Sequence, residues 1–412
     1  MTLIECFDRS VAENIVSCLH LRPEKLIFLG EQHKMQPIMQ SYRSFFAARG
    51  MQVDVQMQHV RMKKMEKITQ TLDRIVRQEG KCVIDVTGGD ERLLMAVGAM
   101  LIGLDERRRA RVAVQKFDLE TGNAQDCDGD GLLIPGQPVT LSVEELIALH
   151  GGKVHPRSYQ PSESETLRDL EPLWQVLVED PKEWNLAMMA LEELESYADS
   201  REQVFLPLAH IRGQITHFEE KRRRVEALLE RLQNRGILYN QSREGVLEYS
   251  FQTPLYRYCT RKVGNLLEVK VLLEARAAEG EKGRLFQDCK MGVNIDWDGV
   301  IHNGYPRPPE TRNEIDVMLM HGLKPVFVSC KSGDVDEEEL YKLHAVTTYF
   351  GGMEAQKVLI ATNYEKPMPS AFTQRAKDMD VRLVTDAATF TGEDWKALFE
   401  QITNGKNKEK IF

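Results

Sequence analysis

Residues 1–117 alternate short apolar runs with longer amphipathic segments, and this alternation restricts the possible folds more than any other feature of the chain. The apolar runs have the length and composition of strands, and the segments between them have helical spacing. The expected strands are 3–7, 25–30, 51–57, 82–86 and 111–117, and the expected helices are 10–21, 37–49, 61–79 and 91–104. This order predicts an α/β fold with a mostly parallel sheet, helices on both faces, and ligands beyond the carboxyl ends of the strands.

One of these strand ends is rich in glycine. Residues 83–99 run from a strand through Thr87, Gly88 and Gly89 into a helix. Glycines allow the backbone to approach a ligand closely, and the free N–H groups at a helix start favour a phosphate. A tight strand-to-helix turn would use the same glycines, so spacing alone does not separate the two interpretations.

Residues 311–332 have the pattern of a β-hairpin, with a short connection at 321–325. The period of two places Glu314 and Asp316 on one face of the first strand, and Ser329 and Lys331 on one face of the second. If the faces coincide, two carboxylates, a hydroxyl and an ammonium group converge, which folding alone does not require. Paired acids beside a lysine are typical of metal-assisted phosphodiester cleavage.

The segments around the hairpin extend this pattern. The order is helix, three strands, helix, strand. The expected helices are 263–276 and 335–350, and the expected strands outside the hairpin are 284–297 before it and 355–362 after the second helix. With its acids and lysine, this order resembles the PD-(D/E)xK nuclease core. The resemblance implies that Glu268 is the helix acid, Asp316 the strand acid and Lys331 the motif lysine. It also implies Mg²⁺ or Mn²⁺ held by Glu268, Asp316 and the backbone carbonyl of Cys330.

Ser329 departs from this family pattern, because it occupies the position of the motif Asp or Glu. A hydroxyl is a weaker ligand for a hard cation than a carboxylate. In one interpretation Glu314 supplies the missing charge, and in the other Glu314 is a surface residue and water completes the site. Asp296 and Asp298 could also contribute, but they are more typical of a turn at Gly299.

The N-terminal glycine segment carries a second resemblance. Asp85-Val-Thr-Gly-Gly89, followed by a helix of small residues, is similar to the signature of CRISPR-associated Rossmann-fold (CARF) sensor domains. Such domains dimerise and bind cyclic oligoadenylates across the two-fold axis. Carried over to this chain, the resemblance implies an activator site made of Asp8, Arg9, Ser10, Glu31, Gln32, His33, Thr87, Gly88, Gly89 and Arg92.

The middle of the chain has a different character. Residues 151–165 are rich in Gly, Pro, Ser and His, as in a linker, and are followed by expected helices at 163–179, 182–196 and 215–235 and a strand at 246–251. Helices followed by a β-wing resemble a winged helix-turn-helix. The basic run 221–224 could touch nucleic acid, but a solvated helix face is favoured because acids flank it. The expected division is a sensor at 1–150, a linker and helical, winged-helix-like segment at 151–260, and a nuclease-like domain at 261–412.

Composition sets broader limits. The net charge of -9 over 412 residues argues that nucleic acid would be bound by local patches only. Seven scattered cysteines without a CxxC pair favour a reducing compartment. The chain shows neither a signal peptide nor an apolar stretch of the roughly 20 residues that span a bilayer. A cytoplasmic protein without a membrane partner is expected.

Taken together, the chain resembles the ancillary nucleases of type III CRISPR systems that join a CARF sensor to a PD-(D/E)xK-like nuclease. The resemblance implies a homodimer activated by a cyclic oligoadenylate, cutting RNA, DNA or both. Cyclic tetra-adenylate is the expected activator, with the hexa-adenylate as the other candidate, and 151–260 would transmit activation. The alternative is a ligand-controlled winged-helix transcription factor with a degenerate nuclease domain, and Ser329 is its best support.

Overall fold

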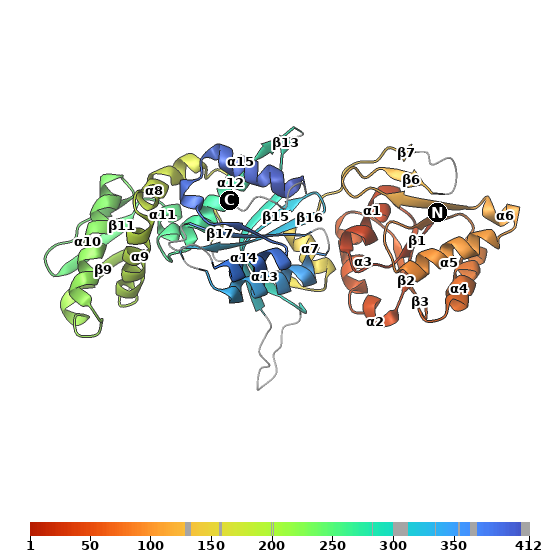
Figure 1. Ribbon diagram of the computed structural model, residues 1–412, viewed down its shortest axis with the longest axis horizontal. Coiled ribbons are helices and arrows are strands. Elements are labelled where there is room, and N and C mark those ends of the chain that lie inside the picture. Colours follow the sequence, from red (N-terminus) through yellow and green to blue (C-terminus); the bar gives the residue numbers. More distant parts are fainter. Residues whose placement is uncertain are drawn as a thin grey trace.

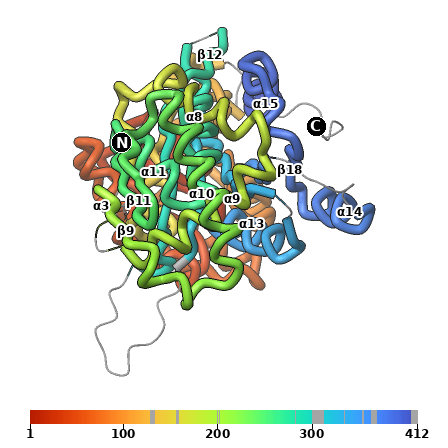
Figure 2. Tube along the Cα trace, turned by 90° about the vertical axis from the view of Figure 1, so that its left-hand side faces the viewer, coloured from red at the N-terminus to blue at the C-terminus, as the bar shows by residue number. Residues whose placement is uncertain are grey.

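The computed structural model describes residues 1–127, 133–155, 159–198, 200, 202–281, 283–299, 312–333, 335–352, 355–362 and 369–404. Three parts lie in a row along the long axis (Figure 1). An α/β part with the N-terminus forms one end, a sheet with helices on both faces forms the centre, and a helical part with a small sheet forms the other end. Figure 2 looks along this axis from the helical end.

The N-terminal part is built on a seven-stranded sheet of order β3-β2-β1-β4-β5-β6-β7. Its five parallel strands are β1 (Thr2–Cys6), β2 (Lys25–Gly30), β3 (Asp54–His59), β4 (Cys82–Asp85) and β5 (Val112–Phe117). Two antiparallel strands, β6 (Ala124–Asp126) and β7 (Leu133–Ile134), extend one edge. The expected Rossmann-like α/β class is confirmed.

Helices cover both faces of this sheet because the strands β1, β2 and β4 are buried on both sides. Along β1, Leu3 packs toward one group of helices and Ile4 toward the other. The first group is α1 (Val11–Leu21), α2 (Gln32–Met35) and α3 (Met39–Ala48), and the second is α4 (Met65–Gln78) and α5 (Glu91–Ile102). The short α6 (Glu106–Arg109) precedes β5.

The central part contains a six-stranded sheet of order β18-β17-β16-β15-β14-β8. The predicted hairpin is present as β15 (Arg312–His321) and β16 (Lys324–Lys331), flanked by antiparallel β14 (Asp288–Asp296) and by parallel β17 (Gln356–Ala361) and β18 (Val381–Val384). The edge strand β8 (Lys153–His155) pairs with β14, although its residues were expected in a linker. A small ribbon, β12 (Glu279–Gly280) and β13 (Gly283–Arg284), precedes β14.

The helices of the central part fall into two groups. Those that share a core with Val317 and Cys330 are α12 (Asn265–Ala277) and α15 (Gly392–Thr403). Those that share a core with Met318 and Phe327, on the other face, are α7 (Val143–Leu149), α13 (Glu337–Phe350) and α14 (Ser370–Asp378). The hairpin is therefore enclosed between α12 and α13.

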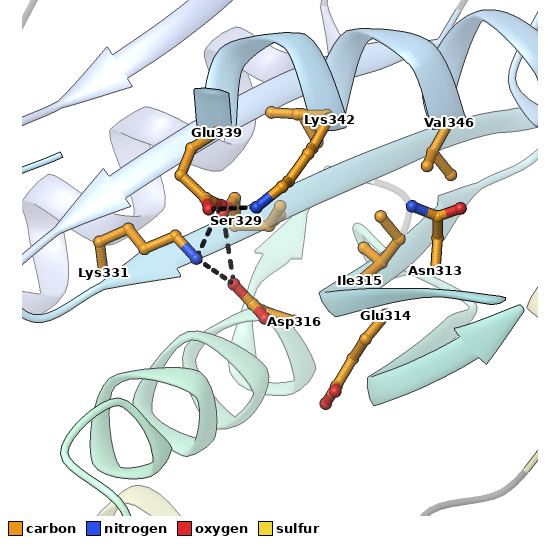
Figure 3. Close-up of a pocket in the computed structure, with 11 residues that line it drawn as sticks. Asn313, Glu314, Ile315, Asp316, Ser329, Lys331, Glu339, Lys342 and Val346 are labelled. Atoms are coloured by element: carbon orange, nitrogen blue, oxygen red, sulfur yellow. Dashed lines mark hydrogen bonds and ion pairs between the residues drawn. The ribbon is translucent and has the colours of Figure 1, made fainter. Parts of the chain in front are cut away.

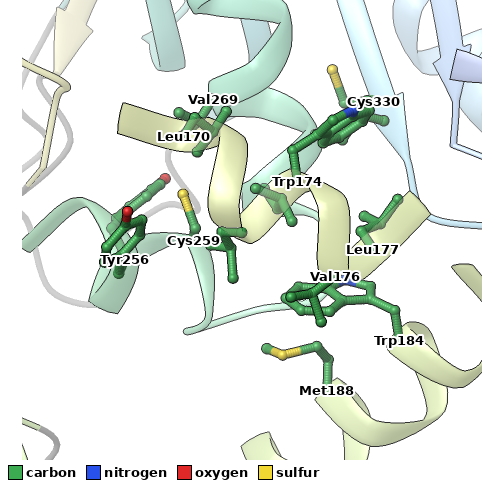
Figure 4. Close-up of a cluster of buried hydrophobic side chains, with 14 of the residues drawn as sticks. Leu170, Trp174, Val176, Leu177, Trp184, Met188, Tyr256, Cys259, Val269 and Cys330 are labelled. Atoms are coloured by element: carbon green, nitrogen blue, oxygen red, sulfur yellow. The ribbon is translucent and has the colours of Figure 1, made fainter. Parts of the chain in front are cut away.

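The remaining part consists of helices and a three-stranded sheet of order β10-β11-β9. Its elements are α8 (Leu167–Glu179), α9 (Pro181–Glu195), β9 (Gln203–Pro207), α10 (Phe218–Asn234), β10 (Leu238–Asn240), β11 (Val246–Phe251) and α11 (Pro254–Cys259). Trp174 of α8 is buried in one core with Val269 of α12 and Cys330 of β16 (Figure 4). This part therefore packs directly on the hairpin sheet through α12.

The short helix α7 connects the N-terminal part to the central sheet. Arg49 at the end of α3 forms an ion pair of 2.6 Å with Glu145 of α7 and donates a hydrogen bond of 2.8 Å to the carbonyl of Thr140. At the start of the same helix, the N–H of Val143 donates to Oδ2 of Asp288 at 2.8 Å. The two parts are thus held together by side-chain contacts as well as by the chain.

All seven cysteines are unpaired, and six of them are buried. Within the part of the chain that the structure describes, every helix is too short or too polar to cross a lipid bilayer.

Candidate active site

The predicted hairpin residues meet where β15 and β16 separate. The pairing of the two strands ends at Val317 and Val328, so the strands open like a fork beyond these residues. The carboxylate of Asp316 fills the fork: its Oδ2 accepts hydrogen bonds from the N–H of Cys330 at 2.7 Å and from Oγ of Ser329 at 3.3 Å. Asp316 is therefore fixed by the backbone of the neighbouring strand.

The simple alternation along β15 breaks at the same point. Ile315 packs in the core on the α13 side, whereas Val317 packs in the core on the α12 side. On β14, Val293 pairs with Ile315 and Met291 pairs with Val317. Gly292 lies between these two partners, and its φ of 56° lies in the left-handed region. Glu314 is consequently exposed and points away from Asp316 and Lys331 (Figure 3). Glu314 nevertheless lines the same pocket as Asp316, and after burial its charge also raises the pKa of Asp316.

Lys331 has a second acidic neighbour that the sequence did not identify. Its Nζ lies 2.8 Å from Oε2 of Glu339 and 4.0 Å from Oδ2 of Asp316 (Figure 3). Glu339 comes from the first turn of α13, where three consecutive acids suit a helix N-terminus and look ordinary. The available signal was its spacing from Leu343 and Val346, which places a carboxylate on the inward face of the helix.

These side chains line one pocket of about 160 Å³ between the hairpin and α13. The pocket residues are Asn313, Glu314, Ile315, Asp316, Val328, Ser329, Lys331, Glu339, Lys342, Leu343 and Val346. Polar and charged groups thus line the open end of the fork, with apolar side chains of α13 behind them.

Burial and charge shift the ionisation of this cluster. Burial raises the pKa of Asp316, although Lys331 and the Cys330 N–H act in the opposite direction. Burial lowers the pKa of Lys331, but Asp316 and Glu339 outweigh it, so that this pKa lies above its usual range. Burial also raises the pKa of Glu339, but its pairing with Lys331 and Lys342 leaves that pKa below the usual value. Lys331 and Glu339 are therefore both charged at neutral pH.

Glu268, the expected helix acid, is buried on α12 and is not among the residues that line this pocket. It lies near enough to Cys330 to raise the pKa of its thiol, after burial and Asp316. The cysteine is buried in the core on the α12 side. The structure therefore brings Asp316, Ser329 and Lys331 together with Glu339, while Glu268 approaches the fork from the α12 side.

No three His, Cys, Asp or Glu side chains are arranged to hold a metal ion among the residues that the structure describes. Mg²⁺ needs no such cage, because it commonly binds one or two carboxylates together with substrate phosphates. Asp316, with its buried carboxylate in the fork, offers the hard oxygen that Mg²⁺ or Mn²⁺ prefers. The residues present thus fit a hard divalent cation. Asp296 is buried, with its Oδ2 3.7 Å from Nε2 of His155, and neither Asp296 nor Asp298 lines the pocket.

The predicted activator loops lie together at the carboxyl ends of β1, β2 and β4. Asp8 connects two of them: its Oδ1 accepts from the N–H of Ser10 at 2.8 Å and its Oδ2 from the N–H of Gly89 at 2.9 Å. Strands β1 and β4 are neighbours whose connections leave in opposite directions, which is the switch point where open α/β sheets bind ligands. The described loops thus surround the expected place for a ligand.

The individual loop residues differ in what they can offer a ligand. The hydroxyl of Thr87 already bonds to Asp85 and accepts from the N–H of Phe117 at 2.8 Å, so its side chain mainly fixes the loop. Arg9 and Arg92 are exposed, with Arg92 at the start of α5. The loop after β2 contains Glu31, Gln32 and His33, where Glu31 pairs with Lys34 at 2.6 Å.

The two glycines have different structural roles. Gly89 has a φ of 107°, and a Cβ there would lie 2.6 Å from Cβ of Cys6. At Gly88 a Cβ would meet Glu13 and Asp8. A tight turn therefore requires both glycines, whether or not a ligand binds.

Residues 257–397 match the family model of the Card1-like endonuclease domain. No curated protein matches the chain. Three solved structures are similar in fold. Protein VC1899 from Vibrio cholerae has a TM-score of 0.69 at 15% identity, covering 98% of this chain and 97% of that one. Can2 from Sulfobacillus thermosulfidooxidans in complex with cyclic tetra-adenylate has a TM-score of 0.64 at 15% identity, with the same coverage.

The third similar structure is a type III CRISPR defence DNA nuclease activated by cyclic oligoadenylate. Its TM-score is 0.51 at 14% identity, and the match covers 93% of this chain but 47% of that one. The matched endonuclease segment contains β14 to β18 with α12 and α13, and therefore the whole pocket at the fork.

Proposed function

We propose that this chain, whose residues 257–397 carry a Card1-like endonuclease domain, is a metal-dependent endonuclease activated by a cyclic oligoadenylate in type III CRISPR defence. The observation that carries the proposal is the meeting of Asp316, Ser329 and Lys331 in one pocket inside the matched segment. The full-length similarity in fold to Can2, whose structure contains cyclic tetra-adenylate, supports the sensor half of the proposal.

The proposed cleavage assigns separate roles to the pocket residues. A Mg²⁺ or Mn²⁺ ion would polarise the scissile phosphate and stabilise developing charge. Asp316 would bind that cation, held in position by the N–H of Cys330. Lys331 is a cation at neutral pH because its pKa is raised, so it is suited to orient the attacking water or the phosphate, not to remove a proton. Glu268, from the α12 side, would support the carbonyl face of Cys330.

The proposed activator is cyclic tetra-adenylate, bound at the switch point by the loops after β1, β2 and β4. Exposed Arg9 and Arg92 are placed to meet phosphates. Helix α5 begins beside the same loop, where the side chain of Asp90 accepts a hydrogen bond of 3.0 Å from the N–H of Arg92. Asp8 joins two of these loops, so a ligand that contacts either loop affects both.

The proposed assembly is a homodimer through the N-terminal part. The outer face of α5 is apolar: Met95 is 66% exposed and Ile102 is 90% exposed, with Gly98 and Ala99 exposed between them. Leu133 of the edge strand β7 is also exposed. Exposed apolar surface of this kind is typical of an interface, and it follows directly on the glycine loop where the activator is proposed to bind.

Activation requires that the ligand prefers one arrangement of the sensor and nuclease parts over another. We place the coupling in α7 and not in 151–260, because α7 bonds to Arg49 on one side and to Asp288 on the other. The ion pair of Lys324, the first residue of β16, with Glu120 is a second contact between these parts. A shift of the N-terminal part would therefore reach the hairpin directly.

The transcription-factor alternative has less support. The matched family model describes an endonuclease domain. In the basic run of α10, Lys221 pairs with Glu193 at 2.6 Å and Arg224 pairs with Glu183 and Glu220. These ion pairs neutralise the charges that a DNA-binding helix would offer to phosphates.

The test is a cleavage assay on the full-length protein with cyclic oligoadenylates of each ring size, Mg²⁺ or Mn²⁺, and labelled single- and double-stranded RNA and DNA. We expect cleavage that needs both the metal and one ring size, and that disappears in Asp316→Ala. Sequence-specific DNA binding without cleavage under all these conditions would favour the transcription factor. Cleavage that persists in Asp316→Ala would reject the assigned site.

A further inference from the structure

We infer that Glu339, from helix α13, supplies the carboxylate that strand β16 lacks at Ser329, so that Asp316 and Glu339 together form the divalent-cation site. This inference rests on the proposed function and assigns one more residue to the same pocket. Neither the hairpin pattern nor the resemblance to the PD-(D/E)xK core points to a residue of α13 at this place.

The first support is the position of Lys331 between two carboxylates. Its Nζ lies 2.8 Å from Oε2 of Glu339 and 4.0 Å from Oδ2 of Asp316. An ammonium group in this position identifies a place where the side chains stabilise positive charge. Figure 3 shows Ser329, which replaces the motif carboxylate, beside the charged groups of Lys331 and Glu339. The motif position and Glu339 therefore face the same space.

The second support is that Glu339 is oriented into the pocket by its helix. It is half-buried, and with Leu343 and Val346 it lines the same pocket as Asp316. An acid on the inward face of an amphipathic helix is unfavourable unless it has a partner. It has two such partners, because Oε2 lies 2.8 Å from Nζ of Lys331 and Oε1 lies 3.3 Å from Nζ of Lys342, and a carboxylate is the oxygen ligand that a hard cation prefers.

The other acids near the pocket are less suitable. Glu314 lines the pocket but is exposed and points away from Lys331 (Figure 3). Glu338 is next to Glu339 in sequence, yet it faces solvent, pairs with Lys342 at 2.9 Å and is not a pocket residue. Glu338 therefore provides a matched control for charge removal on the same helix turn.

The test measures Mn²⁺ binding to the full-length protein by titration calorimetry, with no substrate present. We expect Glu339→Gln to weaken binding by at least about tenfold, as for loss of groups that hold a metal site. Glu338→Gln should bind as the wild type does. Adding Ser329→Asp to Glu339→Gln should restore Mn²⁺ binding, because it returns a carboxylate to the motif position. Thermal unfolding of each variant checks that it is folded.

Unchanged Mn²⁺ affinity in Glu339→Gln would overturn the inference and leave the proposed nuclease intact. The same loss in Glu338→Gln would also overturn it, since a general charge effect would then explain the result. A loss that Ser329→Asp does not restore would show that Glu339 only positions Lys331. Absence of Mn²⁺ binding by the wild type, with no cleavage, would reject the proposed function itself.

Discussion

Gly88 lies among the loops where the activator is proposed to bind, and its contacts set the expected effect of replacing it. A Cβ at Gly88 would lie 2.6 Å from Oε2 of Glu13, 2.8 Å from Cβ of Glu13 and 3.0 Å from Cβ of Asp8. Valine adds two methyl groups beyond that Cβ. Helix α1 or the loop after β1 must therefore move away from the loop after β4.

The expected cost is moderate. Inserting methyl groups into a packed site typically destabilises a protein by about 1–3 kcal/mol. This is below the roughly 5–15 kcal/mol that keeps a domain folded, so Gly88→Val should remain folded. In the free variant the loops can move apart to relieve the contacts of the valine. If activator binding needs the present spacing of the loops at Asp8, binding must restore those contacts, and their free-energy cost is then subtracted from the binding free energy. A loss of about 1–3 kcal/mol corresponds to roughly 5- to 150-fold weaker binding of the activator.

The assay pairs thermal unfolding with calorimetry of cyclic tetra-adenylate binding. Gly80→Val is the matched control, because nothing lies within 4 Å of a Cβ at Gly80 and its backbone does not require glycine. We expect the control to bind the activator as the wild type does. A folded Gly88→Val variant with unchanged affinity would refute the placement of the activator at these loops.

Four further predictions concern the nuclease pocket and its coupling. Lys331→Ala should abolish cleavage while activator affinity stays within about 0.5 kcal/mol, and cleavage in a preparation free of contaminating nuclease would contradict this. Because burial raises the pKa of Asp316, the folded metal-free protein holds this proton more tightly than the unfolded chain, and stability is lost as pH rises through the raised pKa. Asp316→Asn removes that loss, so the melting temperature of the variant should rise relative to that of the wild type as pH rises. Melting temperatures that change with pH in parallel would contradict this prediction. Ser329→Ala should weaken Mn²⁺ binding by less than about tenfold. Glu314→Gln should leave Mn²⁺ binding unchanged, since Glu314 points away from Lys331; a large loss of Mn²⁺ affinity in Glu314→Gln would show that this carboxylate belongs to the metal site. Arg49→Ala should reduce activator-dependent cleavage while activator and metal binding persist separately, and full activation in this variant would exclude α7 as the coupling element.

Much of the fold was predictable because it depends on local periodicity. Strand β2 has the expected bounds, and the helices α1, α3, α4 and α5 lie within their predicted segments. The hairpin and the flanking α12 and α13 were also expected, and the match at 257–397 agrees with the resemblance. The short strand β8 could not be predicted, because three residues in a segment rich in Gly and Pro carry no period. Its pairing with β14 is a purely long-range contact.

The sequence by itself predicted most of the helices and strands, and it placed Asp316 and Lys331 near the ends of two adjoining strands. Spacing along a strand is enough for this, because it fixes which side chains lie near the end of the strand. Only the tertiary structure decided how the site is completed. The fork between β15 and β16 turns Asp316 toward the Cys330 N–H, while Glu314 lines the same pocket but points away from Lys331. Local spacing does not predict this, since a strand that separates from its neighbour no longer follows the period of two. The packing angle of α13 on the sheet brings Glu339 to Lys331, and nothing within an isolated helix sequence specifies which of three adjacent acids will face the pocket.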